Sequence, residues 1–157
     1  MSAKRILMVF SEQESGLRAM IEPRLAAGAR GELRLDTAQT RWQALPMIEH
    51  ERFDLVVVGA HLAASPLDPA SDEGGLELCK AIRLHSKVPI AFVAPLYTNH
   101  LQSALQRLDP PPTLFVNDHT VADEIAAKVA QIRPQVHRLD VVIHANEGTD
   151  WRYDLVG

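Results

Sequence analysis

Five short apolar runs mark the chain between residues 5 and 116. Residues 5–10, 54–58 and 88–93 are almost continuously apolar, which is typical of strands that are covered on both faces of a parallel sheet. Residues 32–36 alternate between apolar and polar side chains, and residues 112–116 begin at the end of a run of prolines. These two runs are therefore predicted to form edge strands.

Between the runs, apolar residues recur at the spacing of a helix. Three such stripes predict amphipathic helices that cover the sheet. They are Leu17, Met20, Ile21 and Leu25, with Gly28 as a stop; Leu101, Ala104, Leu105 and Leu108; and Val121, Ile125, Val129 and Ile132. A fourth helix is predicted around residues 76–84, and a fifth over residues 40–51, where Pro46 removes an amide donor and should kink the helix.

Strand and helix thus alternate five times over roughly residues 4–133. This order predicts an α/β domain, with a parallel sheet, helices on both faces and right-handed crossovers. We expect residues 1–133 to form this domain and residues 134–157 to form a C-terminal extension. The extension holds one more apolar run, residues 139–143, which is either a sixth strand or the start of a connection to another domain.

Composition narrows the class of protein. The chain has 157 residues, of which 46% are hydrophobic, and this suffices for one globular domain with a proper core. A net charge of −4 with dispersed basic residues argues against direct binding of nucleic acid. The apolar run at residues 6–10 is too short for a signal peptide or a membrane span. The single cysteine, Cys79, is expected to be buried, so we expect a cytoplasmic protein without a membrane anchor.

Three segments give the chain a resemblance to the receiver domains of two-component response regulators. Residues 54–58 resemble the third strand of that family, residues 75–83 its third helix and residues 88–93 its fourth strand. The resemblance covers about residues 4–133. It implies a flavodoxin-like (βα)5 sandwich of three layers, with the strand order 2-1-3-4-5 and a site at the carboxyl ends of strands 1 and 3.

The resemblance also implies a phosphorylation site whose chemistry this chain lacks. The family holds Mg²⁺ with two acidic residues after strand 1, phosphorylates an aspartate after strand 3, and adds a hydroxyl residue after strand 4 and a lysine after strand 5. A hard cation needs carboxylate oxygens, and the transferred phosphoryl group needs its charge neutralised. The matching positions here hold Phe10 and Ser11, Gly59, Ala94, and Asn117 or Asp118. We therefore expect a degenerate site that holds no phosphate, metal or cofactor.

Nearby carboxylates do not replace the missing ones. Glu12 is the carboxylate left after strand 1, and it is displaced by one residue. Residues 60–74 form a loop that is longer than the usual turn of the family, and Asp68 or Asp72 in it is an acceptor in principle. Without a pair of acidic residues to hold the metal, we do not expect either aspartate to be phosphorylated.

Histidines near the same edge raise the question of catalysis. His61 follows the third strand and is either a general base or pH sensor or, in the interpretation that we favour, an ordinary loop histidine. Asp118 and His119 would have to turn toward His61 to form a catalytic pair, and no Gly-x-Ser-x-Gly motif accompanies them. The seven histidines show no metal-ligand spacing. We therefore predict no enzyme and no metal centre.

Protein binding is the function that we expect instead. The resemblance implies a dimer and partner surface on the fourth helix, the fifth strand and the fifth helix. Leu101 and Leu105 lie in the fourth helix, and Tyr97, a candidate switching aromatic, lies at the start of the fourth helix. We predict a non-catalytic pseudo-receiver that pairs with itself or another protein within a larger regulatory protein. The alternative is a flavodoxin-like enzyme or ligand-binding domain whose mouth holds Ser11, Ser15, His61 and His119. Glu12 and Glu14 would repel the phosphate of a flavin from this mouth.

Overall fold

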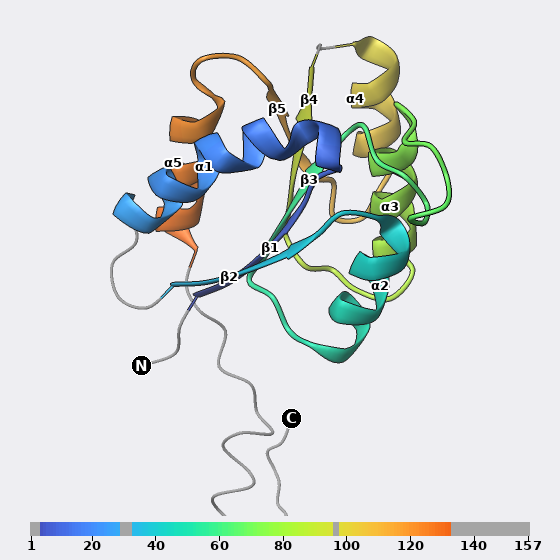
Figure 1. Cartoon of the computed structure of the whole chain (residues 1–157), viewed down its shortest axis with the longest axis horizontal. Helices are drawn as coiled ribbons and strands as arrows, with labels where there is room; N and C mark the ends of the chain where they lie inside the picture. The colour runs from blue at the N-terminus through green and yellow to red at the C-terminus, as the bar shows by residue number, and fades with distance from the viewer. Residues whose placement is uncertain (1–3, 29–32, 96–97, 133–157) are drawn as a thin grey trace, which may run out of the picture.

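The computed structural model describes residues 4–28, 33–95 and 98–132, and these form a five-stranded sheet between two layers of helices (Figure 1). The strands pair in the order β2-β1-β3-β4-β5, and each neighbouring pair is parallel. Their bounds are β1 Lys4–Val9, β2 Leu33–Ala38, β3 Leu55–Gly59, β4 Ile90–Ala94 and β5 Thr113–Val116. The predicted α/β class and strand order are confirmed.

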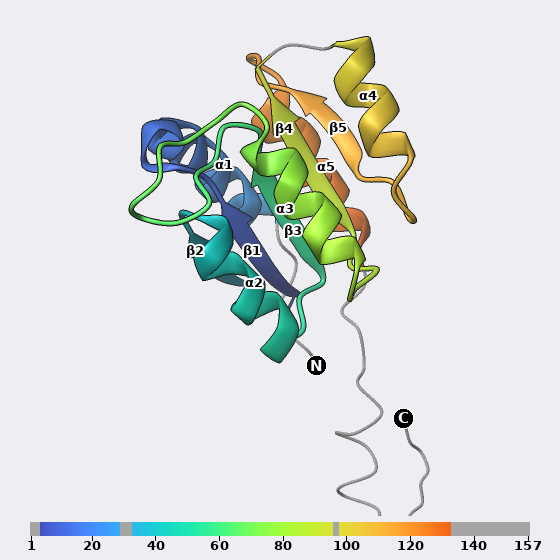
Figure 2. The same cartoon turned by 90° about the vertical axis from the view of Figure 1, so that its right-hand side faces the viewer.

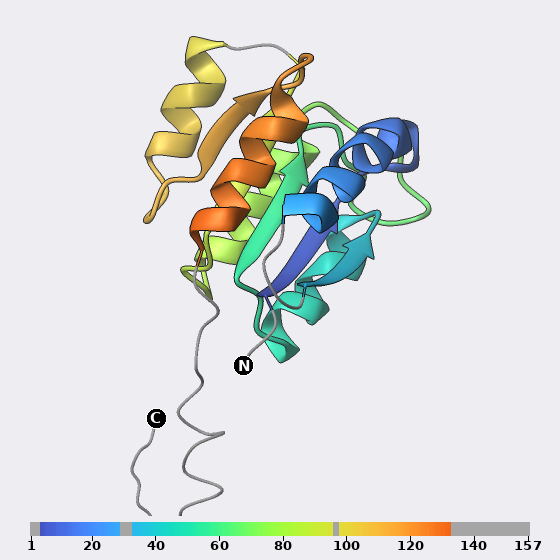
Figure 3. The same ribbon diagram turned by 90° about the vertical axis from the view of Figure 1, so that its left-hand side faces the viewer.

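Five α-helices and one short 3-10 turn, η1, connect the strands of the described chain. Their bounds are η1 Glu12–Glu14, α1 Ser15–Gly28, α2 Arg41–His50, α3 Gly74–Arg83, α4 Asn99–Gln106 and α5 Val121–Gln131. Helices α1 and α5 cover one face of the sheet, and α2, α3 and α4 cover the other (Figures 1 and 3). Where the chain is described, no helix is long and apolar enough to cross a bilayer.

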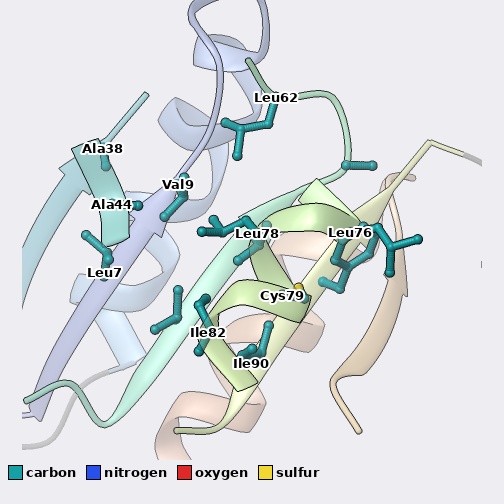
Figure 4. Packing of buried hydrophobic residues seen from close by; sticks show 14 of the residues in the cluster. Leu7, Val9, Ala38, Ala44, Leu62, Leu76, Leu78, Cys79, Ile82 and Ile90 are labelled. Atoms are coloured by element: carbon teal, nitrogen blue, oxygen red, sulfur yellow. The ribbon is translucent and has the colours of Figure 1, made fainter. Parts of the chain in front are cut away.

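The core lies in two layers, one on each face of the sheet. Strand β3 is buried along its whole length, and its side chains alternate between the layers: Val56 and Val58 pack under α2, α3 and α4, whereas Leu55 and Val57 pack under α1 and α5. Figure 4 shows the first of these layers, to which Cys79 belongs. Burial raises the pKa of the Cys79 thiol to about 12, so this cysteine is a packing group and not a nucleophile.

Most of the predicted elements appear at or near their predicted positions. The two runs predicted as edge strands are β2 and β5, which do form the edges of the sheet. Helix α2 is continuous from Arg41 to His50 with Pro46 inside it. Pro46 is exposed, so water can reach the backbone group that proline leaves without a partner. The strand predicted at residues 139–143 lies outside the described residues.

The loop that joins β3 to α3, residues 60–73, is held to the molecule by backbone hydrogen bonds. The first two amides of α2 donate to the carbonyl oxygens of Ala63 and Ala64, at 3.0 and 2.9 Å. Helix amides at these positions have no partner inside the helix, so the loop satisfies them. Leu62 and Ser71 exchange two further hydrogen bonds of 3.0 and 3.1 Å. The loop is therefore folded on itself and anchored to α2.

Candidate functional site

The carboxyl ends of β1, β3 and β4 meet at one edge of the sheet, beside the point where the strand order reverses. Val9 pairs with Val58, and Gly59 pairs with Val93, so the segments that follow these strands lie side by side. Figure 2 shows the loop 60–73 passing over this edge toward the start of α1. Open parallel sheets bind ligands at such an edge, which makes it the candidate site.

The ring of Phe10 fills the space next to Gly59. A Cβ atom added to Gly59 would lie 2.7 Å from Cδ1 and 3.1 Å from Cε1 of that ring. Phe10 is only 1% exposed and belongs to the core layer under α1 and α5. Phe10, which was predicted to stand in place of a metal-binding acid, is therefore part of the hydrophobic core.

Glu14 occupies the remaining space over Gly59. Its Oε1 atom overlaps the place where a Cβ atom of residue 59 would stand. This oxygen is buried and has no hydrogen-bond partner among the described residues. The pKa of Glu14 is raised to about 7, chiefly by burial and in smaller part by the nearby Asp72, against the opposing effects of His61 and of a hydrogen bond from the Ser11 backbone.

His61 links the loop 60–73 to η1. Its Nδ1 atom lies 2.9 Å from Oδ1 of Asp72, and its Nε2 atom lies 2.7 Å from Oε1 of Gln13. Because both partners are oxygen acceptors, a doubly protonated ring satisfies both contacts. The Asp72 side chain is 92% exposed, so water screens its contact with the ring. The histidine is thus a bridge between two segments that are distant in the sequence.

The other residues predicted for the degenerate site lie at the same edge without forming a binding group. Ser11 is buried, and its hydroxyl finds no partner within the described residues. Ala94 is buried in the core, and Asn117 is exposed. Asp118 accepts hydrogen bonds from the backbone and the hydroxyl of Thr120, at 2.7 and 2.6 Å, and these bonds lower its pKa. Asp118 therefore stabilises the start of α5.

Carboxylates and histidines do not converge at this edge. Across residues 4–28, 33–95 and 98–132, no group of three or more His, Cys, Asp or Glu side chains is placed to hold a metal ion. His119 is exposed, and the Asp118 carboxylate binds Thr120. Both ring nitrogens of His61 are engaged by Asp72 and Gln13. The pairing of His61 with Asp118 and His119 is therefore not formed.

The predicted partner surface is only partly available at the predicted residues. Leu105 is 1% exposed and belongs to the core, where it holds α4 on the sheet. Leu101 is half-buried and packs against the same layer. Tyr97 lies outside the described residues. Exposed residues on α4 such as Ser103, and not the predicted leucines, offer the surface there.

Sequence reasoning identified this edge but missed Glu14 as its central residue. Glu14 stands four residues after Phe10, and only the turn of η1 brings it back over the end of β3. The one signal in the sequence was indirect. A glycine at position 59 leaves a space beside the end of a buried strand, and some neighbouring side chain has to fill it.

A second hollow lies at the opposite edge of the sheet. It has a volume of about 890 Å³ and is lined by the ends of α2 and α3 and by the segments before β3 and β4. Apolar residues such as Ile48 and Ile82 form part of its wall, and charged residues such as Arg52 and Lys87 form the rest. It is remote from Ser11, Ser15, His61 and His119, so it lends no support to a ligand site at the mouth that these residues were predicted to form.

Comparison with solved structures finds the same fold in bacterial response regulators. A two-component response regulator from Clostridium difficile is 18% identical, with a TM-score of 0.62 over 80% of this chain and 92% of that one. The chemotaxis response regulator CheY4 of Vibrio cholerae is 17% identical, with a TM-score of 0.62 over 82% and 99%. The response regulator TrrA of Thermotoga maritima, solved in complex with Mg²⁺-BeF, is 24% identical, with a TM-score of 0.57 over 80% and 96%.

These matches establish the fold and extend over nearly the whole of each neighbour. At identities below 25%, they carry the architecture and not the chemistry of a site. No protein-family model matches the chain, and no curated protein matches it. The chain thus has the receiver-domain fold.

Proposed function

We propose that this chain is a pseudo-receiver, a regulatory domain of signal transduction that works in the cytoplasm by binding a protein partner and does not accept a phosphoryl group. The observation that carries the proposal is the filling of the space beside Gly59 by the Phe10 ring and the Glu14 carboxyl group. Its fold neighbours are response regulators, and a regulatory role fits that fold.

The described residues at this edge provide neither a set of ligands for a metal ion nor an acceptor for a phosphoryl group. Mg²⁺ requires oxygen ligands in octahedral geometry, usually including one or two carboxylates. Phe10 provides a buried hydrocarbon ring at the position of such a carboxylate, and Gly59 provides no side-chain nucleophile. Without the cation, none of the described residues at the replaced positions offers a positive charge to a transferred phosphoryl group.

The two loop aspartates do not restore the missing acceptor. Asp68 is exposed and accepts a hydrogen bond of 2.8 Å from the hydroxyl of Ser65 within its own turn. Asp72 faces His61 and is almost fully exposed. Across the described residues, neither aspartate belongs to a group of three or more His, Cys, Asp or Glu side chains that is placed to hold a metal ion.

We predict that the full chain does not respond to a phosphoryl analogue. The measurement is a pair of backbone amide spectra with Mg²⁺ alone and with Mg²⁺ plus beryllofluoride, in which we expect no cluster of shifts around Ser11, Gly59 and Ala60. The variant Gly59→Asp adds a carboxyl group at the acceptor position, against the Phe10 ring and the Glu14 carboxyl group, but not the metal-binding pair, so it should also stay silent. Shifts clustered at these residues in the wild-type chain would overturn the proposal.

We further propose that the partner docks on the face formed by α4, β5 and α5, either as a second copy or as another protein. Helix α4 carries exposed polar residues on the side away from its core leucines. We expect Ser103→Arg to weaken self-association measured by sedimentation at increasing concentration. Ala26→Arg, on the exposed side of α1, is the matched control and should associate like the wild type. Equal effects of the two variants would remove α4 from an interface between two copies of this chain.

A further inference from the structure

We propose that the Glu14 carboxyl group is the built-in substitute for the missing acceptor side chain, and that gain or loss of its proton changes how the loop 60–73 is held. This inference rests on the proposed pseudo-receiver function, because it names the signal that takes the place of phosphorylation at the same edge. It concerns three segments of the described chain, which are η1, the end of β3 and the loop 60–73.

The Glu14 carboxyl group lies over Gly59, at the end of β3. The turn of η1 is closed by a hydrogen bond of 2.9 Å from the Glu14 amide to the Ser11 carbonyl oxygen, and it brings the side chain back over the sheet. Gly59 has no side chain of its own, and the Glu14 Oε1 atom takes the place of its absent Cβ atom. The carboxyl group therefore occupies the point from which an acceptor side chain would begin.

A side-chain contact connects η1 to the loop 60–73. Gln13, the neighbour of Glu14 in η1, contacts the His61 ring at 2.7 Å, and the same ring contacts Asp72 at 2.9 Å. Between these two loop residues, Leu62 and Ser71 exchange hydrogen bonds of 3.0 and 3.1 Å. A shift of η1 therefore displaces the His61 ring and, with it, both ends of the folded loop.

Several neighbouring groups raise or lower the pKa of the Glu14 carboxyl group. From the loop, His61 favours the charged carboxylate and Asp72 opposes it. The Ser11 amide, just before η1, favours the carboxylate by a hydrogen bond. Glu12 of the same turn is exposed. Burial is the largest influence, and it places the pKa of Glu14 at about 7, so that both protonation states are populated near neutral pH.

No described charge on the adjacent helix compensates for this burial. The first charged side chain of α1 in the sequence, that of Arg18, pairs with Glu22 at 3.2 Å. A neutral carboxyl group can stay over Gly59, whereas a carboxylate whose Oε1 atom lacks a donor is drawn toward water. We expect the loop to be held closely below the Glu14 pKa and released above it.

The test is a pH titration of the full chain followed by NMR. The side-chain carboxyl carbon of Glu14 should titrate close to pH 7, and the amides of Leu62 and Ser71 should shift with the same midpoint. Glu14→Gln keeps the shape of the neutral acid and should abolish this common step. Glu12→Gln changes the exposed carboxylate of the same turn and should leave it intact.

Two results would overturn the inference. One is a Glu14 carboxyl group that titrates below pH 5 in the wild-type chain, and the other is a Leu62 and Ser71 step that persists unchanged in Glu14→Gln. The first readout needs no variant, so a misfolded variant does not leave the question open. The beryllofluoride experiment does not depend on either of these readouts. A response to beryllofluoride would overturn the pseudo-receiver function, and the titration of Glu14 would still decide whether its proton changes the loop.

A second readout follows from the sign of the pKa shift. The pKa of Glu14 in the folded chain lies above its ordinary value of 4.5, so its contribution to stability is complete below pH 4.5 and is lost as the pH rises through about 7. The urea midpoint of the wild-type chain should therefore fall over this window relative to that of Glu14→Gln. Glu12→Gln should follow the wild type.

Discussion

Replacing Gly74 with alanine is expected to lower the free energy of unfolding by about 3 kcal/mol, the upper part of the range for overpacked positions. Gly74 is the first residue of α3, and its added Cβ atom would overlap the carbonyl oxygen of Leu62 and lie 2.6 Å from the carbonyl carbon. The obstacle is backbone, and the two hydrogen bonds between Leu62 and Ser71 fix it in place. It cannot move aside without opening the loop.

Gly16→Ala is the matched control for this prediction. Gly16 is the second residue of α1, and nothing lies within 4 Å of the Cβ atom that alanine would add there. We expect this variant to be as stable as the wild type or more stable by about 0.5–1 kcal/mol, because alanine loses less backbone entropy in a helix. Urea unfolding followed by circular dichroism measures both variants. A Gly74→Ala variant that unfolds like Gly16→Ala would mean that the loop does not rest against α3.

The fold was largely predictable because a buried parallel sheet leaves a direct mark on the sequence. Strand β3 touches a helix layer on each face, so all of its residues are apolar or glycine, and no alternation is possible. Strand β2 lies at an edge and shows the alternation that half-burial produces. These patterns depend on neighbours that any sheet of this kind has, and they can therefore be recognised without knowing the particular contacts.

The candidate site was predictable only in what it lacks. The absence of carboxylates at Phe10 and Gly59 can be read by position, because the ends of strands are fixed by the fold. The presence of Glu14 over Gly59 depends on the exact turn of η1 and on the volume that one missing side chain leaves. The same holds for His61, whose two partners come from segments 48 and 11 residues away in the sequence. Spacing along the chain does not encode such a contact.

The contacts of the loop 60–73 also could not be predicted from the sequence. Its richness in proline, serine and aspartate indicated a long connection, and that much was correct. Its hydrogen bonds to the first amides of α2 could not be anticipated, because they join backbone groups whose pairing leaves no side-chain signature. For this reason the sequence identified a loop, and the structure identified its contacts with η1, α2 and α3.

Phe92→Ala is expected to have the largest effect on stability, a loss of about 3–5 kcal/mol. Phe92 lies in the middle of β4, is fully buried, and belongs to the core layer that holds Leu105 and the rest of α4 on the sheet. Phe115→Ala in the neighbouring edge strand is the matched control and should cost less, because that ring is only partly buried. Urea unfolding compares the two, and a smaller loss for Phe92→Ala than for Phe115→Ala would contradict the assignment.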